Sequence, residues 1–185
     1  TYFSNDLIHG LLGNRHSNID SLRTHFPTVN FKRIKQVHGD KSVHTSPHSI
    51  DFANEADAHY TSEKNLAMCI STADCIPVFF FHREPRWVLG IHAGWRGVEK
   101  RIVPKALQIL KKQGCDPKHI FGIVGPHIQK NSFEAGNDVR DLLLKSVQNG
   151  QKSMFFEEKS DGKSLVDLNL ILKEQNLLKK KQEWK

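Results

Sequence analysis

Short apolar runs, several of them closed by an ionisable side chain, recur through the middle of the chain. Continuous apolar runs of about four to eight residues are typical of buried strands. They predict five β-strands here: Phe31–Val37, Ala67–Ser71, Val78–Phe81, Trp87–Ile91 and Ile120–Val124. Pro77 stands where the third strand begins, a position at which a sheet tolerates proline.

Apolar residues at helical spacing predict three helices: Val98–Gln113, Asp138–Asn149 and Asp167–Leu178. Pro104 interrupts the first, so either a first turn breaks there or the main helix begins there. Gly150 would end the second helix, and Asp167 is a candidate cap of the third. Strands and helices mix without regular βαβ alternation. We therefore predict an α/β (α+β) fold, a single layered domain over residues 1–185 with mixed β-sheets flanked by helices.

Composition and charge restrict the class of protein. Hydrophobic residues make up 38% and charged residues 25% of the chain, which is ordinary for a globular domain. The net charge of +7 would suit nucleic acid, but the densest basic run, Lys179–Lys181 with Lys185, has no interleaved aromatic residues. We expect a solvated basic surface and no nucleic-acid partner. No window reaches the roughly 18 apolar residues of a membrane helix, so we expect no membrane partner.

Cysteine content indicates the compartment. Three cysteines are an odd number and too few for a disulfide scaffold, which favours a reducing environment. The first residues also lack the basic and apolar regions of a signal peptide. We therefore expect a cytoplasmic protein.

Three residues of metal-ligand type stand next to the predicted strands, namely His38, Cys75 and His92. A thiolate and two neutral imidazoles suit Zn²⁺, and Cu²⁺ is possible as well. Three protein ligands leave one position open, as in catalytic zinc sites, where the pKa of coordinated water falls to about 7. The ligands lie too far apart in sequence for a local zinc finger. By spacing alone, a core cysteine with two unrelated histidines is the simpler interpretation.

The residues that follow the last of these histidines carry more specific information. In His92–Gly97, two glycines flank Trp95 and Arg96, so the backbone can turn sharply and approach a ligand closely. Arg96 offers a planar fork for phosphate or carboxylate, with a structural ion pair as the alternative. Trp95 could stack on a base or pack in the core. Asp74 could orient a ligand, transfer a proton or cap the next segment.

A further loop, Gly125–Ile128, is expected to return to the same face of the molecule. Its His127 is more simply explained as a surface histidine. Cys69 is expected to be a core thiol. The remaining histidines show no ligand-like spacing and are expected at the surface: His9, His16, His25, His44, His48, His59, His82 and His119.

Three motifs in this order resemble the YfiH family, also called the laccase-domain or multicopper polyphenol oxidoreductase family. They are Lys35–Gly39, Thr72–Pro77 and His92–Gly97, with weaker matches at Gly125–Ile128, Phe133–Gly136 and Asp167–Asn169. The resemblance runs from about residue 31 to 178. It implies a layered α/β fold with mixed sheets and a metal bound by His38, Cys75 and His92.

The resemblance also implies an activity. Members of the family are described as zinc-binding enzymes that phosphorolyse adenosine, inosine, guanosine and methylthioadenosine and also deaminate adenosine. The implied partners are purine nucleosides and phosphate, and we expect a monomer or a small homo-oligomer. Cys75, Asp74 and Arg96 are then the candidate catalytic residues, with Asp74 moving protons and Arg96 near phosphate.

Three alternative functions stay open. Cys75 could be a nucleophile with His92 or His38 as its base, giving a hydrolase of an amide or a peptidoglycan precursor. The family has also been described as copper-dependent polyphenol oxidases (laccases), although this sequence supplies only one convincing ligand trio. The third alternative is a metal- or nucleoside-binding regulator without turnover.

The chain departs from the family pattern in two places. Members usually carry a Gly- and Ser-rich loop with an arginine before an Asn-Arg pair, whereas here Gly13 runs directly into Asn14 and Arg15. Members also continue past the third helix, whereas this sequence stops at Lys185. We therefore expect a YfiH-like domain that lacks an N-terminal loop and the C-terminal segment, either in the protein itself or only in the sequence given. The flanking sequence resumes in register, which favours the second.

Overall fold

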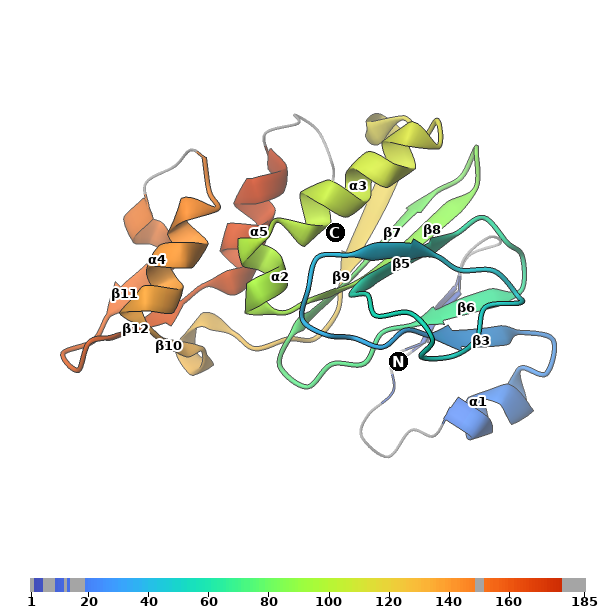
Figure 1. The fold of residues 1–185 in the computed structure, drawn as a ribbon, viewed down its shortest axis with the longest axis horizontal. Coiled ribbons are helices and arrows are strands. Elements are labelled where there is room, and N and C mark those ends of the chain that lie inside the picture. Colours follow the sequence, from blue (N-terminus) through green and yellow to red (C-terminus); the bar gives the residue numbers. More distant parts are fainter. Residues whose placement is uncertain (1, 5–8, 12, 14–18, 149–151, 178–185) are drawn as a thin grey trace.

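The computed structural model describes residues 2–4, 9–11, 13, 19–148 and 152–177. At its centre is a five-stranded sheet in the order β4-β5-β8-β7-β9 (Figure 1). The strands are β4 (Ser42–His44), β5 (Ala58–Thr61), β7 (Ile76–His82), β8 (Trp87–Ala93) and β9 (Ile120–Val124). The pair β4–β5 is parallel and the other neighbours are antiparallel, so the sheet is mixed.

The antiparallel hairpin of β7 and β8 forms the middle of this sheet. Both strands are longer than predicted, because Ile76 pairs with Ala93 at one end and His82 with Trp87 at the other. His92 therefore lies within β8 instead of following it. The observed bounds of β9 match the predicted strand.

In the described part of the chain, five α-helices and three smaller sheets accompany the central sheet. The helices after the hairpin are α2 (Trp95–Glu99), α3 (Ile102–Lys112), α4 (Asn137–Lys145) and α5 (Leu168–Leu177), and α1 (Ile19–His25) precedes the sheet. The smaller sheets are β1 (Tyr2–Ser4) with β2 (His9–Leu11), β3 (Asn30–Arg33) with β6 (Leu66–Cys69), and β10 (Glu134–Gly136), β12 (Lys163–Val166) and β11 (Phe156–Glu158). Short 3₁₀ helices are η1 (Pro117–His119), η2 (Lys130–Ser132) and η3 (Lys152–Phe155).

The main core lies between the central sheet and the helices. Helix α3 packs against β8, and α2 contacts α3, α4 and α5 (Figure 1). Fully buried side chains from both layers form one cluster, among them Phe80, Leu89, Ile102, Leu110 and Ile171. This is the predicted layered arrangement of mixed sheets flanked by helices.

The predicted helix Val98–Gln113 is two helices, and the break precedes Pro104. Arg101 adopts a left-handed conformation (φ 62°) and separates α2 from α3. Pro104 lies in the first turn of α3, where its missing N–H removes no intrahelical bond. A sequence pattern contains no signal for an arginine at positive φ, which is why the break was misplaced.

The other two predicted helices differ only at their ends. Helix α4 ends at Lys145, and the predicted end at Asn149 and the stop at Gly150 lie outside the described residues. The cap of α5 is confirmed, because the backbone N–H of Leu170 donates to Asp167 Oδ1 at 2.8 Å. Leu178, Lys179–Lys181 and Lys185 lie outside the described residues, as do Asn14 and Arg15.

Two histidines that were expected at the surface are buried. His59 is completely buried on β5 and His82 is nearly so on β7, because both point inward in a buried sheet. Their Nδ1 atoms are hydrogen bonded to the Thr45 hydroxyl and to the Pro85 carbonyl, respectively. The histidines exposed as expected are His25, His44, His48 and His119, whereas His16 and the side chain of His9 lie outside the description.

None of the helices in the described part of the chain has the length and apolar character that a bilayer span requires. Cys69, Cys75 and Cys115 are all free thiols, as expected for a protein without a disulfide scaffold.

Candidate metal centre

Three separate segments bring His38, Cys75 and His92 to one place. His38 comes from the loop after β3, Cys75 immediately precedes β7, and His92 lies near the end of β8. One potential ligand atom from each lies within 4.8 Å of the others. The two imidazole rings meet edge to face with their centroids 4.8 Å apart. The predicted trio is therefore a group that could hold a metal ion.

Gly94 allows this close approach. A Cβ atom at this position would lie 3.0 Å from His38 Cδ2 and 3.1 Å from Cys75 Sγ, shorter than ordinary van der Waals contacts. At Gly97 a Cβ would lie 2.9 Å from the carbonyl oxygen of Gly39, in the loop that carries His38. The sequence predicts that these glycines permit a close backbone approach. Gly94 lies close to His38 and Cys75, and Gly97 lies close to the loop that carries His38.

Asp57 is the residue of this site that sequence reasoning missed. It is fully buried, and its carboxylate accepts a hydrogen bond from His92 Nδ1 at 2.8 Å. It also accepts bonds from the backbone N–H groups of Val37, His38 and Gly39, at 3.2, 2.9 and 2.6 Å. One carboxylate thus holds His92 and the loop of His38, in which His38 itself has φ 58°.

The electrostatics of Asp57 and His92 are coupled. Burial by itself would raise the pKa of Asp57, but the bonds from His92 and from three backbone amides together hold it below the usual range. Burial would lower the pKa of His92, yet its hydrogen bonds with Asp57 and Cys75 raise that pKa to about 9. Each group therefore stabilises the charged form of the other.

The donor set fits a borderline-soft metal ion. Because His92 Nδ1 is engaged by Asp57, Nε2 is the ring nitrogen left to act as a ligand, the arrangement usual for metal-binding histidines. A cysteine sulfur and two imidazole nitrogens suit zinc, and they suit copper as well. His92 is buried, Cys75 is half-buried and His38 is exposed, so one side of the trio faces solvent.

Asp74 and Arg96 both lie beside the trio in sequence and are exposed. The Arg96 guanidinium stacks over the Trp95 ring at 4.4 Å from its centroid. Within the described part of the chain Arg96 forms no ion pair, so its fork is available to an anion. Trp95 is half-buried and packs against the core cluster.

The loop of His127 runs beside the segment that carries Asp74 and Cys75. The N–H of Gly125 donates to the Pro77 carbonyl and that of Ile128 to the Asp74 carbonyl, both at 2.9 Å. The expected return of this loop is therefore observed. His127 is half-buried, donates from Nδ1 to the Gly125 carbonyl at 2.8 Å and has a buried Nε2, so it is not the simple surface residue expected.

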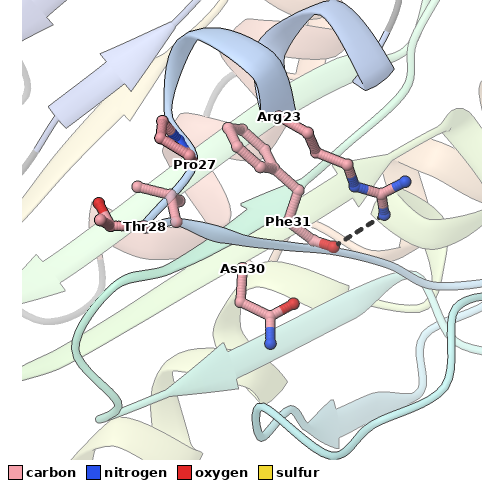
Figure 2. A pocket seen from close by; sticks show the side chains of 6 residues that line it. Arg23, Pro27, Thr28, Asn30 and Phe31 are labelled. Atoms are coloured by element: carbon pink, nitrogen blue, oxygen red, sulfur yellow. Dashed lines mark hydrogen bonds between the residues drawn. The ribbon is translucent and has the colours of Figure 1, made fainter.

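Two surface hollows among the described residues are lined by residues other than the trio. A pocket of about 380 Å³ lies between α1 and β3, where Arg23 donates to the Phe31 carbonyl at 3.4 Å (Figure 2). A second, of about 270 Å³, is lined by Arg33–Gln36, Phe52, Cys69 and Ser71. Neither contains a set of metal ligands, so the chemistry of the side chains, not the size of a hollow, identifies the candidate site.

The protein has a layered α/β fold with mixed sheets, and its His–Cys–His trio lies at one end of the central hairpin. These two features make it a candidate metalloprotein. Residues 6–180 match the family described as multi-copper polyphenol oxidoreductase laccase. The chain belongs to this family, which is the laccase-domain (YfiH) family that its three motifs predict.

Three similar proteins are named purine nucleoside phosphorylases. The purine nucleoside phosphorylase of Rickettsia conorii is 28% identical over 152 residues, which cover 82% of this chain and 61% of the relative. That of Aquifex aeolicus is 34% identical over 103 residues, covering 56% and 48%. Escherichia coli YfiH, also named a purine nucleoside phosphorylase, is 32% identical over 111 residues, covering 60% and 44%. The chain thus spans about half of the length of these curated relatives.

Solved structures confirm the fold class. YlmD from Geobacillus stearothermophilus aligns with a TM-score of 0.75 at 26% identity, covering 85% of this chain and 62% of YlmD. Bacillus licheniformis YfiH aligns with a TM-score of 0.72 at 23% identity, covering 84% of this chain and 62% of that protein, and supports the fold alone.

Proposed function

We propose that this protein is a zinc-dependent purine nucleoside phosphorylase that also deaminates adenosine. The observation that carries the proposal is the convergence of His38, Cys75 and His92, with their ligand atoms within 4.8 Å of one another. The names of the relatives supply the substrate class, a purine nucleoside with phosphate as the second substrate. The resemblance to the family narrows the proposed nucleosides to adenosine, inosine, guanosine or methylthioadenosine.

The trio would hold the metal, and the neighbouring residues would handle the substrates. A bound zinc ion supplies a Lewis acid beside the substrate. Asp57 fixes the ring of His92 through Nδ1 and so presents Nε2 toward the site. Gly94 leaves room for the two ligands that approach it.

Arg96 is the cation that we assign to phosphate. Its planar fork can donate two hydrogen bonds to phosphate oxygens, and its stacking on Trp95 holds the fork in place. In phosphorolysis a phosphate oxygen bonds to C1′ of the ribose while the bond from C1′ to the purine nitrogen breaks. The electron pair leaves with the purine, which then takes up a proton. We assign proton transfer in either reaction to Asp74, the exposed carboxylate next to Cys75.

An assay of the products tests the proposal. Protein of defined metal content is incubated with adenosine, with and without phosphate, and the products are separated by HPLC. In the presence of phosphate we expect adenine and ribose 1-phosphate, and from deamination we expect inosine. Cys75→Ala should form none of these products. Arg96→Ala should fold normally and lose mainly the phosphate-dependent reaction. If zinc-loaded protein forms no product from any purine nucleoside, the proposed activity is wrong.

The metal itself needs a separate measurement. Elemental analysis of the purified protein should find zinc at about one ion per chain, whereas bound copper with oxidation of phenols would support a polyphenol oxidase. The described residues contain one group that could hold a metal ion. Oxidation of phenols with four-electron reduction of oxygen uses several coppers, so this single group argues against a polyphenol oxidase.

A second candidate function is favoured by the contact between Cys75 and His92. Their potential ligand atoms lie within 4.8 Å of each other, and an imidazole beside a thiol is the arrangement of a cysteine nucleophile with its base, as in a hydrolase of amides. Alkylation of Cys75 distinguishes the two functions. If metal-free protein has hydrolase activity that alkylation abolishes and zinc inhibits, the hydrolase is supported. If turnover requires zinc, the cysteine hydrolase is excluded.

A further inference from the structure

Gln36 is a conspicuous residue of the His38 loop that is neither a ligand nor part of the core. Its carboxamide pairs with the backbone of a single residue, Ser71, in both directions. Gln36 Nε2 donates to the Ser71 carbonyl at 2.7 Å, and the Ser71 N–H donates to Gln36 Oε1 at 2.9 Å. A side chain here forms the two bonds that a neighbouring strand would otherwise provide.

The place of this contact explains what it connects. Strands β3 and β6 pair in parallel, and their ladder ends where Arg33 meets Cys69. Beyond that point the segment that follows β3 pairs elsewhere, through an isolated β-bridge between Lys35 and Glu55. The two segments separate there, yet His38 lies on one and Cys75 on the other. The Gln36 carboxamide spans the gap two residues before His38 and four residues before Cys75.

We propose that Gln36 is a positioning residue that sets Cys75 relative to His38 and so prepares the trio before a metal arrives. This inference rests on the metal centre of the proposed function, but not on the substrate. Asp57 fixes His38 relative to His92, and the β7–β8 hairpin places His92 beside Cys75. The Gln36–Ser71 contact provides the remaining link, between the segments that carry His38 and Cys75.

The alternative is that Gln36 only fills space beside the small pocket that it lines with Ser71 and Cys69. Gln36→Glu separates the two roles because glutamate has the same shape. Its carboxylate can still accept from the Ser71 N–H, but it cannot donate to the Ser71 carbonyl and repels that oxygen. A space-filling role survives this change, and a hydrogen-bonding role does not.

The experiment compares zinc affinity by competition with a chromophoric chelator in the wild type, Gln36→Glu and Gln108→Glu. Gln108 is exposed on α3, so Gln108→Glu adds the same charge away from the contact. We expect Gln36→Glu to weaken zinc binding about tenfold or more, as loss of outer partners of a metal site does. A negative charge near the site would by itself strengthen cation binding, so a loss cannot come from charge.

A spectroscopic measurement identifies the ligand that moves. With Co²⁺ in place of zinc, the charge-transfer band from thiolate to metal reports the bond to Cys75. We expect this band to weaken in Gln36→Glu and to stay unchanged in Gln108→Glu. Gln36→Met, of similar length and uncharged, should behave like Gln36→Glu and replaces it if the glutamate variant does not fold, as judged by circular dichroism.

Two results would overturn the inference. Wild-type affinity together with a wild-type cobalt band in Gln36→Glu or Gln36→Met would show that the carboxamide does not position Cys75. Failure of the wild type itself to bind zinc or cobalt would overturn the metal centre, and the role of Gln36 with it. Zinc binding without any turnover of purine nucleosides would contradict only the proposed activity and would leave the inference in force.

Discussion

Asp57 joins two ligands of the candidate site without being one of them. Its four accepted hydrogen bonds come from His92 and from the loop that carries His38. Loss of such partners lowers metal affinity about 10- to 100-fold. We expect Asp57→Asn, which keeps the size of the side chain but cannot accept bonds from all four donors, to weaken zinc binding by about that factor in a chelator competition.

Asp51→Asn is the matched control. The side chain of Asp51 accepts bonds from Arg23 and from the backbone and side chain of Arg33, and none of these partners belongs to the trio, so its amide variant should bind zinc like the wild type. Unchanged affinity in Asp57→Asn would show that the trio keeps its geometry without the carboxylate.

His59 should make stability depend on pH. Burial lowers the pKa of its imidazole to about 4, whereas an unfolded histidine titrates near about 6.5. Between these values the unfolded chain binds a proton that the folded protein does not. The free energy of unfolding should therefore fall as the pH is lowered from about 6.5 to about 4, by up to about 3 kcal/mol.

Denaturant unfolding across this pH window tests the expectation. His59→Asn should show a shallower fall in stability than the wild type because it removes the titrating group. Well below pH 6.5, His92, whose pKa is raised to about 9 in the folded protein, is protonated in both states and contributes little to the slope. Equal slopes in the two proteins would rule out His59 as the cause.

At this scale the sequence around each residue, and not the spacing, made the trio predictable. Each of the three stands in a motif beside an apolar strand, and Gly94 next to His92 indicated a close approach. Asp57 could not be recognised, because a carboxylate before a strand is ordinary. What distinguishes it is contact with residues such as His38 and His92, which are distant in the sequence.

Among the elements, prediction succeeded where a continuous apolar run decides the structure, as in β9 (Ile120–Val124). It was wrong where long-range contacts compete with the local pattern. Strand β3 was predicted to reach Val37 but ends at Arg33, because Lys35 turns to Glu55 and the next amides bind Asp57. The apolar pattern continues through this stretch, but its hydrogen-bond partners change.

Helix α5 offers a test of an element that was predicted from a single capping residue. Asp167 accepts the N–H of Leu170, and Asp167→Ala leaves that donor without its bond. We expect a loss of about 1 kcal/mol, which for a chain of this size lowers the melting temperature by about 2–4 °C. Calorimetry measures it, and zinc affinity should not change because Asp167 forms its hydrogen bonds with Phe155, Leu170 and Ile171 and not with the trio. An unaltered melting temperature would mean that the cap contributes nothing.

For the whole molecule, the candidate site depends on the tertiary fold, because no two ligands are neighbours in the sequence. We propose that residues 1–185 form one domain corresponding to part of the longer relatives, of which this chain covers 61% in the Rickettsia conorii protein. The sequence predicted the layers but not their contacts, since hydrophobic periodicity fixes which face is buried and not what covers it.

Metal binding should therefore stabilise the entire fold. An ion that binds only the folded state adds about 2.7 kcal/mol when its free concentration is 100 times Kd. That corresponds to a rise of roughly 5–10 °C in the melting temperature. Differential scanning calorimetry with and without zinc measures this rise, and Cys75→Ala should abolish it. A zinc-induced shift that persists in the variant would place the ion elsewhere.

The wide separation of the three ligands also orders events during synthesis. The chain leaves the ribosome with His38 first, Cys75 next and His92 last, and the partner of His92, Asp57, appears between the first two. A nascent chain can therefore capture an ion at the complete trio only after the β7–β8 hairpin has emerged. Capture of an ion at the complete trio would then follow formation of the β7–β8 hairpin, and a bound ion would mark a chain in which this hairpin has formed.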